Sequence, residues 1–421
     1  MKCLFQVFGV VTLALAFVVS VGIDFSHEMQ GGAADFRNRI TGARLIEHGI
    51  DPYHFIWYPG DPAEFCDWRN NPKMTVSKTT VTPTMLVIYG PLAALPYRVA
   101  QFLWLFMQWL LLLGTAWLWL RGETSAWRRW AVAFFVIGFT FTPGWRWEAE
   151  RGQCYALLFF LFAYWLVSTR AVGRGSDFVA GFVAGMLVAL RPPFVVLLPF
   201  VALHRRAQLP GAAAGFLACM VLPLLMNSHV WMYYASAMQT NSDYYRHTSL
   251  PPRPPQAFPE MIEGASTAIL EKMTGYYPYV DVTVYALARR SGWGILPDLP
   301  FILVFGGLFL GWLFWKRRAD VESLLPGMAA WLFLSDLIMP TTRWGYYDVN
   351  ILNVVLAGII VAKKLPWVVL PALIATLVMC SFYVVANLPV CLLYVSEALF
   401  VLCAILCVFW SRTSEPETRA T

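Results

Sequence analysis

Long apolar runs recur along this chain and constrain its fold more than any other feature. Several of them reach about 18 residues, the length that an α-helix needs to cross the hydrocarbon core of a bilayer. The first run covers Cys3–Gly22 and the last covers Val390–Trp410. With 58% hydrophobic and only 13% charged residues, the composition excludes an ordinary soluble enzyme of this length. The sequence therefore predicts an all-α polytopic membrane protein that forms one domain over residues 1–421.

The short loops between the apolar runs carry many of the basic residues. Examples are Arg128–Arg129, His204–Arg206, Lys316–Arg318 and Lys363–Lys364. Short basic loops stay in the cytoplasm, so we expect cytoplasmic termini and about 11–13 helices that cross the inner or plasma membrane. The first run ends in VVSVG without a small-residue cleavage site, which favours an uncleaved first helix. The net charge of +6 reflects these loops, and no nucleic-acid partner is expected.

Four polar segments fall on the opposite, extracytoplasmic side of this topology. They are residues 24–95, Pro143–Gln153, 227–300 and Pro340–Asp348. All four are rich in Trp and Tyr, and some of these rings belong to the interfacial aromatic belt. Acids, arginines and aromatic rings at one leaflet also suit an amphiphile with an anionic head, a sugar and a lipid tail.

The apolar segment Phe178–Leu203 is interrupted at its centre by Arg191-Pro192-Pro193. Proline removes helix backbone hydrogen bonds, and a charged side chain is costly in hydrocarbon. Two short helices that meet at Arg191 satisfy both constraints and keep the charge away from lipid. The alternative is a single kinked helix whose arginine reaches the membrane interface.

A polar, motif-like stretch, Asp35–Pro59, lies shortly after the first run. Its apolar residues recur near helical spacing: Phe36, Ile40, Ala43 and Ile46. Gly49 stands where such a helix would end. The stretch predicts a short amphipathic helix that lies on a membrane surface and has a carboxylate at its start.

The eight cysteines show no spacing typical of a metal site. Six of them lie in apolar runs, where a small buried thiol is the simpler interpretation. Cys66 and Cys154 lie in polar segments on one predicted side, which leaves a disulfide between them open. The chain also contains no Asp-x-Asp motif.

Several short motifs occur in a suggestive order. They are Asp35-Phe36, Ala43…Leu45…Gly49…Asp51-Pro52-Tyr53, Tyr89…Pro91-Leu92…Leu95-Pro96, Gly152-Gln153, Gly181…Gly185…Arg191-Pro192 and Tyr346-Tyr347. In this order the chain resembles the GT-C superfamily of membrane glycosyltransferases, and within it the polyprenol-phosphate-mannose-dependent mannosyltransferases. The resemblance covers nearly the whole chain. Two features depart from it, because arginine replaces the usual lysine before Pro192 and the run before the second span reads TPTM.

The resemblance implies an inverting transfer of a sugar, with mannose the family's usual one, from a polyprenyl-phosphate donor to an acceptor hydroxyl. The acceptor would belong to a glycolipid or polysaccharide. A carboxylate must take the hydroxyl proton, and Asp35 matches the family position, with Asp24 as the second choice. Donors must bind the leaving phosphate. The candidates for phosphate and substrate binding are Arg37, Arg151, Gln153, Arg191, Arg343, Tyr346 and Tyr347. No metal or other cofactor is expected, because arginines can receive a phosphate that is already attached to lipid.

Each candidate also has a simpler interpretation. Asp35 can cap the helix that it begins, and Arg191 can satisfy carbonyls at a broken helix. Two other function classes remain open. A ligase or polymerase of lipid-linked polysaccharide would also use outside arginines, but it gives no reason for an acid soon after the first helix. A transporter would predict inverted repeats and acids in mid-span, and the sequence shows neither clearly.

Overall fold

The computed structural model confirms an all-α membrane protein. It describes residues 2–31, 33–55, 57–58, 60–66, 79–170, 173–247, 282–293, 296–339, 345–361, 366–381 and 391–410. Within these ranges the chain forms α-helices and short 3-10 helices, and no β-sheet is present. Six helical segments are long and apolar enough to cross a membrane: Gln6–Met29, Tyr97–Leu120, Arg206–Leu224, Asp298–Trp315, Val321–Ile338 and Cys391–Trp410. Shorter apolar helices of 10–17 residues accompany them.

The helices follow one another in the chain with short connections. The first half contains α1 (Lys2–Gly31), α2 (Ala34–Glu47), η1 (Ala63–Phe65), α3 (Pro83–Ala93), α4 (Tyr97–Leu120), α5 (Ala126–Phe139), α6 (Pro143–Arg151), α7 (Tyr155–Ser168), α8 (Arg174–Leu190), η2 (Pro192–Val196), α9 (Leu197–His204) and η3 (Arg206–Gln208). The second half contains α10 (Leu209–Leu224), α11 (Val230–His247), α14 (Val284–Arg290), α15 (Asp298–Trp315), α16 (Val321–Ser335), η5 (Asp336–Ile338), η6 (Gly345–Asn350), α17 (Ile351–Val361), η7 (Pro366–Val368), α18 (Leu370–Ser381) and α19 (Cys391–Trp410).

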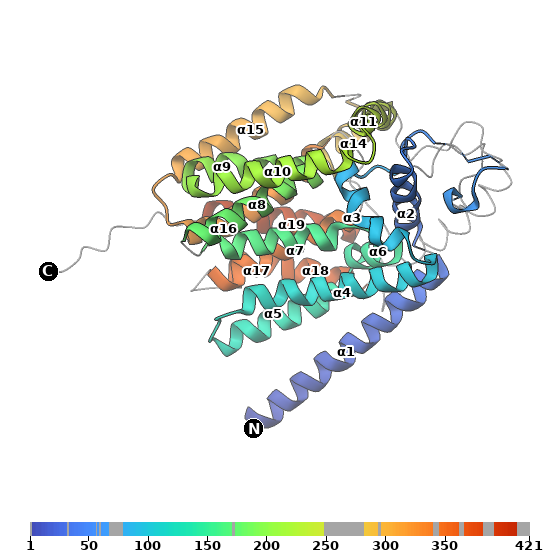
Figure 1. The fold of residues 1–421 in the computed structure, drawn as a ribbon. Coiled ribbons are helices and arrows are strands. Elements are labelled where there is room, and N and C mark those ends of the chain that lie inside the picture. The colour runs from blue at the N-terminus through green and yellow to red at the C-terminus, as the bar shows by residue number, and fades with distance from the viewer. Residues whose placement is uncertain are drawn as a thin grey trace.

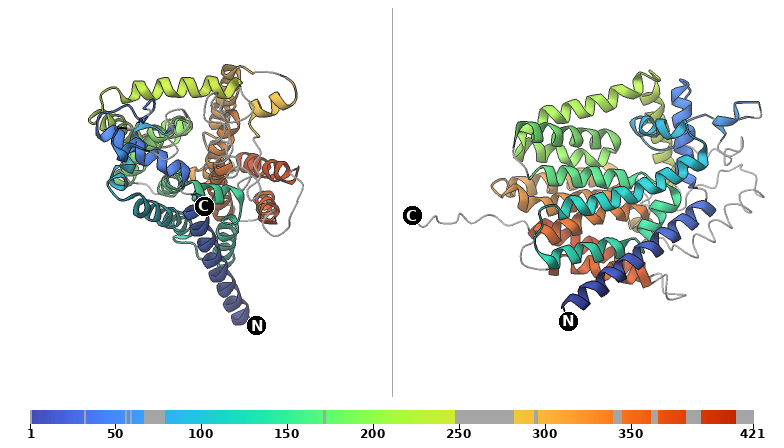
Figure 2. Two further views of the ribbon diagram at one scale, coloured as in Figure 1. Left: turned by 90° about the vertical axis from the view of Figure 1, so that its right-hand side faces the viewer. Right: turned by 60° about the horizontal axis from the view of Figure 1, so that its bottom comes forward.

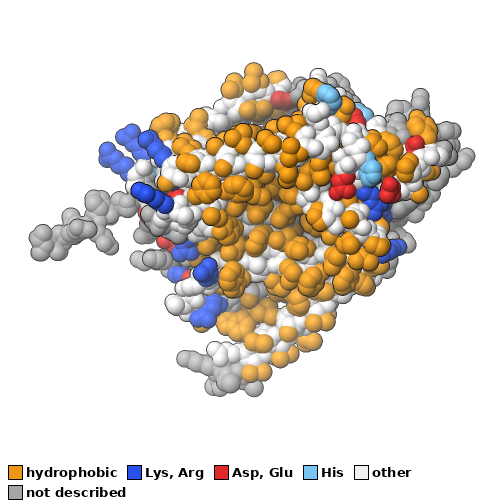
Figure 3. Space-filling model, viewed as in Figure 1, with side chains coloured by type: hydrophobic (Ala, Val, Ile, Leu, Met, Phe, Trp, Pro, Cys, Tyr) orange, Lys and Arg blue, Asp and Glu red, His pale blue; other side chains and the backbone are white. Residues whose placement is uncertain are grey.

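The long helices lie alongside one another as a bundle, and α2, α3 and α6 gather at one end of it (Figure 1). Figure 3 shows that most of the visible Lys and Arg side chains lie at the opposite end, while acidic and histidine side chains lie near α2. The bundle surface between these ends is almost entirely apolar in this view. Such a surface suits a protein whose middle is surrounded by lipid.

The predicted break at Arg191 is confirmed. Helix α8 ends at Leu190, and η2 and α9 lead the chain back to the N-terminal half of α8. There Gln208 lies beside Gly181, because a Cβ atom added at Gly181 would be 2.0 Å from the Gln208 carbonyl oxygen. Arg191 therefore sits at the corner of a helical hairpin and not within a continuous span.

Helices α8 and α10 pack backbone against backbone. A Cβ atom at Gly185 would lie 2.0 Å from the Ala212 carbonyl oxygen, and one at Gly215 would lie 2.1 Å from that of Phe182. Small residues at four-residue spacing are the usual means by which membrane helices approach this closely. The contacts advance in the same direction along both helices, so α8 and α10 are parallel, and α9 is the return segment between them.

Helix α1 diverges from the bundle towards its N-terminus (Figure 2). The outer half exposes large apolar side chains, with Phe8 at 72% and Leu15 at 62% exposed. The inner half contacts α5 and α6, where Ser20 donates to Thr140 Oγ1 at 2.8 Å. The polar contacts of α1 therefore belong to its C-terminal half, at the end of the bundle where α6 lies.

The prediction of an amphipathic helix within Asp35–Pro59 is confirmed in its extent. The prediction that its apolar face lies on a membrane is wrong, because that face packs against other helices. Helix α2 covers Ala34–Glu47, and Gly49 follows with a positive φ of 71°. Both the apolar face and the arginines Arg37 and Arg39 are buried, because α3 and α6 pack against α2. Arg44 donates to the carbonyl oxygens of Ala93, Leu95 and Glu64. The arginines therefore bind protein groups, and α2 does not lie free on a membrane surface.

Candidate functional site

Asp35 lies in the first turn of α2 and is held by two side chains of the α6–α7 corner. The Arg151 guanidinium donates through Nε to Asp35 Oδ2 at 2.5 Å and through Nη2 to Oδ1 at 2.9 Å. The side-chain amide of Gln153 also donates to Asp35 Oδ2. The Asp35 side chain keeps 18% of its surface exposed, so it remains reachable from outside the protein. The structure thus brings three predicted site residues together.

Arg39 completes this cluster, although it stands in none of the sequence motifs. It stands one helical turn after Asp35 on α2, where residues four apart share a face. Its guanidinium donates through Nη1 to the Gly152 carbonyl oxygen at 2.8 Å and through Nη2 to Gln153 Oε1. The side chain is only 6% exposed. The one signal in the sequence was the i, i+4 spacing from Asp35.

The corner between α6 and α7 depends on Gly152. Its φ of 62° is left-handed, and Gln153 N donates to Glu148 O at 2.9 Å while Gly152 N donates to Ala149 O at 3.0 Å. This pair of bonds is the Schellman arrangement that closes a helix C-terminus. A Cβ atom at Gly152 would lie 2.5 Å from the Cβ of Phe36. The glycine therefore permits both the turn and the close approach of α2.

Phe36 fixes the position of its neighbour Asp35. Its ring stacks on Trp104 with centroids 5.8 Å apart and meets Tyr89 edge to face at 5.7 Å. Trp104 Nε1 in turn donates to the Gln153 carbonyl oxygen at 3.0 Å. The Asp-Phe pair therefore combines an apolar anchor with a carboxylate that points towards the corner.

Glu148 lies beneath the same corner and is fully buried. Its Oε1 accepts a hydrogen bond from Ala156 N at 2.7 Å, which caps the start of α7. Oε2 has no hydrogen-bond partner among the described residues. Burial raises the pKa of Glu148 to about 8, and burial also raises the pKa of the nearby Glu150 to about 7. For Arg151, burial opposes the charge, but Asp35 outweighs it and raises the pKa.

Arg191 is buried at the α8–η2 corner and lies between two aromatic rings. Its guanidinium carbon is 4.7 Å from the ring centroid of Tyr155 and 4.8 Å from that of Tyr347. Nη2 donates to Asp336 Oδ1 at 2.7 Å. Nη1 has no hydrogen-bond partner within the part of the chain that the structure describes. Arg191 therefore binds a carboxylate and two aromatic rings. The simpler interpretation was that Arg191 satisfies carbonyls at the broken helix, and among the described residues no hydrogen bond from its side chain to a helix carbonyl is observed.

Tyrosine rings join the Arg191 corner to the Asp35 cluster. Tyr155 begins α7 two residues after Gln153, and its ring centroid lies 5.2 Å from that of Tyr346 and 4.9 Å from that of Tyr347. Tyr346 and Tyr347 are themselves 5.0 Å apart. The three rings are buried or half-buried, so they are part of the protein interior as well as of the predicted site.

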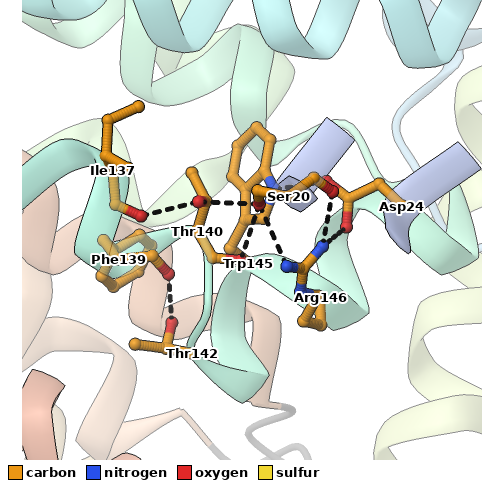
Figure 4. Close-up of polar contacts among 8 residues, drawn as sticks. All are labelled: Ser20, Asp24, Ile137, Phe139, Thr140, Thr142, Trp145 and Arg146. Carbon is orange, nitrogen blue, oxygen red and sulfur yellow. Dashed lines mark hydrogen bonds and ion pairs between the residues drawn. The ribbon is translucent and has the colours of Figure 1, made fainter. Parts of the chain in front are cut away.

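Asp24, the second choice for the base, belongs to a separate buried network (Figure 4). It pairs with Arg146 and accepts a hydrogen bond from Trp145 Nε1 at 2.8 Å. Arg146 also donates to Ser20 O at 2.9 Å. The side chains of Asp24 and Arg146 are each 1% exposed, and their contacts join α1 to α6. This geometry favours Asp35 over Asp24 as a group that meets a substrate.

The remaining candidates have mixed placements. Ala33 occupies the N-cap position of α2, and Asp35 follows in the first turn. Arg37 lies with its guanidinium carbon 5.3 Å from the Tyr97 ring centroid. Arg343 lies outside the described residues. Cys66 and Cys154 are free thiols in this structure. Among the described residues, no three His, Cys, Asp or Glu side chains gather in a way that could hold a metal ion.

Comparison with known proteins identifies a family. The family model for glycosyltransferase family 87 matches residues 80–340, which is more than half of the chain. This segment includes Arg151, Gln153, Arg191 and Asp336, whereas Asp35 precedes it. No curated protein and no solved structure matches the chain.

Proposed function

This chain belongs to glycosyltransferase family 87, and from that membership we propose that it transfers a sugar from a polyprenyl-phosphate donor to an acceptor hydroxyl. The sugar is mannose by the resemblance described above, and the acceptor is a glycolipid or polysaccharide. The single observation that carries the proposal is the cluster in which Asp35, Arg151 and Gln153 meet.

In this proposal Asp35 is the general base. One of its oxygens takes the proton of the acceptor hydroxyl while the hydroxyl oxygen attacks the anomeric carbon. The bond from that carbon to the phosphate oxygen breaks, and the phosphate leaves with the electron pair. A single displacement of this kind inverts the configuration at the anomeric carbon. The reaction needs no proton donor for the leaving group, because a phosphate is stable as an anion.

Arginines receive the phosphate charge as it develops. Arg151 is the candidate next to the base, since its planar fork matches a phosphate as well as it matches the Asp35 carboxylate. Arg191 Nη1 is a second candidate, because it has no hydrogen-bond partner within the described residues. The binding of phosphate by Arg151 would compete with Asp35 and so release a carboxylate oxygen for the acceptor.

The cluster faces the extracytoplasmic side in this proposal. Support comes from the distribution of charge, because most visible Lys and Arg side chains lie at the opposite end of the bundle (Figure 3). Short basic segments remain in the cytoplasm. Both termini would then be cytoplasmic, and the donor would be drawn from the outer leaflet of the cell membrane.

Purified protein in lipid nanodiscs, supplied with radiolabelled mannosyl polyprenyl monophosphate and a glycolipid acceptor, tests the proposal. We expect label in the acceptor and, by NMR, an anomeric configuration opposite to that of the donor. A polyprenyl diphosphate-linked oligosaccharide is the matched comparison donor. Turnover of the diphosphate donor alone would replace the proposal with a polysaccharide ligase, and retention of configuration would contradict a single displacement.

A further inference from the structure

The orientation of the Gln153 side chain follows from the chemistry of its two neighbours. A guanidinium can only donate hydrogen bonds, and an ionised carboxylate can only accept them. The Gln153 amide has one accepting and one donating end, and it lies between Arg39 and Asp35. Its Oε1 must therefore face Arg39, and its NH2 group must face Asp35 Oδ2. The reverse orientation would place like groups together at both contacts.

Arg39 is well placed to impose this orientation. Its guanidinium also donates to the Gly152 carbonyl oxygen at 2.8 Å, so the backbone of the corner and the side chain of Gln153 are fixed by one planar group. Arg39 shares α2 with Asp35, and only 6% of its surface is exposed. A buried guanidinium with two fixed acceptors has little freedom, because its donors form a rigid fork.

We propose that Arg39 is a positioning residue for sugar transfer: it fixes the Gln153 amide, which in turn holds the Asp35 carboxylate towards the acceptor hydroxyl. This inference rests on the proposed function, in which Asp35 is the base. Arg39 does not contact the reacting atoms. It acts through Gln153, and the fourth member of the cluster, Arg151, holds the other side of the same carboxylate.

Without Arg39, the Gln153 amide can rotate, and Asp35 loses both a fixed donor and a nearby positive charge. Each loss disfavours the ionised carboxylate, so the pH at which Asp35 becomes protonated should rise. Among the described residues, Asp35 is faced by Arg151 and Gln153 from the α6–α7 corner, by Arg39 from α2 and by the titratable Tyr346 from η6. The other charged groups near this cluster are Glu148 and Glu150, which lie in α6 and remain in the variant.

The first test follows the pH dependence of kcat/KM, which reports ionisations in the free enzyme. We expect Arg39→Met to move the acidic midpoint of the profile upward and to lower kcat about tenfold or more, with a smaller change in the KM for donor. Gln153→Met should give the same direction. The effect of the double variant should be smaller than the sum of the two single effects, because residues that act through one contact are coupled.

The matched control is Arg44→Met, which removes a third arginine of α2. Arg44 donates to the carbonyl oxygens of Ala93 and Leu95 and not to Gln153, so the acidic midpoint should stay where it is in the unaltered protein. Fully additive effects of Arg39→Met and Gln153→Met, or an acidic midpoint unchanged by both, would overturn the role of Arg39.

A second test needs no donor and therefore separates this inference from the proposed function. Carbodiimide coupling requires a protonated carboxyl, and labelling at Asp35 can be followed by mass spectrometry over a pH series. Arg39→Met should raise the pH midpoint of labelling, and Arg44→Met should not. If Arg39→Met does not fold, Arg39→Lys should give a smaller shift in the same direction. Unshifted labelling in the folded Arg39 variant overturns the inference. If Arg39→Met shifts the labelling midpoint but the wild-type protein shows no turnover, only the proposed function is overturned.

Discussion

Arg151 and Asp35 form a two-point ion pair, with Nε to Oδ2 at 2.5 Å and Nη2 to Oδ1 at 2.9 Å, across 116 residues of sequence. Two residues that were predicted separately, one as a base and one as a phosphate ligand, thus hold each other. In the proposed reaction, a donor phosphate that binds Arg151 has to share or replace this contact. The pair is only partly exposed, with side-chain exposures of 23% and 18%.

Arg151→Lys tests the two-point contact. Lysine keeps the charge but cannot offer a planar pair of donors, so one charge-assisted hydrogen bond should be lost. Such a bond contributes about 1.5–3 kcal/mol, which corresponds to a fall in kcat/KM of about 10- to 150-fold. The assay is sugar transfer from the polyprenyl-phosphate donor. Arg128→Lys, which alters the ion pair with Glu123, is the control and should change transfer less than about twofold.

A Gly152→Ala variant tests the corner that presents Gln153. Alanine would adopt a positive φ and would also place its Cβ 2.5 Å from the Cβ of Phe36. Gly49→Ala is the matched control, because Gly49 has a φ of 71° but no atom within 4 Å of an added Cβ. The control should lose about 1–2 kcal/mol of stability, the cost of the backbone conformation alone. Thermal unfolding in detergent should show a clearly larger loss for Gly152→Ala, and equal losses would contradict the close approach of α2.

The Arg191–Asp336 pair predicts strong coupling between two distant segments. The side chains are 8% and 0% exposed, and removal of one partner leaves a buried charge. Arg191→Met should therefore cost about 3–5 kcal/mol, and the double variant Arg191→Met/Asp336→Leu should cost much less than the sum of the single changes. The surface pair Arg170–Glu322 is the control, and its Arg170→Met variant should change stability by less than about 1 kcal/mol. Additive losses in the first pair would argue against a buried ion pair.

Glu148 predicts a pH dependence of stability. Burial raises its pKa in the folded protein from 4.5 to about 8, so the folded state binds more protons than the unfolded state between these values. The contribution of Glu148 to the free energy of unfolding should therefore be greatest at acid pH, and it should fall as the pH rises from 4.5 to about 8. Glu148→Gln removes the ionisation and should flatten this part of the curve. A melting temperature whose pH dependence is the same in both proteins would contradict the raised pKa.

Much of the fold could be predicted from apolar length and from the break at Arg191. The spans at Tyr97–Leu120 and Cys391–Trp410 follow directly from long apolar runs, and the corner at Arg191 follows from a charge beside two prolines. The location of α2 could not be predicted in the same way. Its arginines look like surface residues in the sequence. However, the backbone carbonyls that accept hydrogen bonds from Arg44 belong to residues 20 to 51 positions away.

The candidate site was predicted in part for a similar reason. Asp35 and Gln153 stand in recognisable motifs, but nothing local shows that Arg151 would bind Asp35. Arg39 was missed because the three arginines of α2 look equivalent in the sequence. Only the structure shows that the Gln153 amide lies between Arg39 and Asp35. The partner of Arg191 is 145 residues away, and an ion pair over that separation is decided by packing.

The measurement that tests the central claim most directly is sugar transfer by an Asp35→Asn variant in nanodiscs, under single-turnover conditions. Asparagine keeps the shape of the side chain but cannot take the proton of the acceptor hydroxyl. The proposed role of Asp35 predicts a rate about 10²- to 10⁴-fold lower, with the donor still bound. Asp51→Asn, which alters an aspartate paired with His54 beyond the end of α2, should retain the wild-type rate. Transfer by Asp35→Asn at the wild-type rate would contradict the assignment of Asp35 as the base.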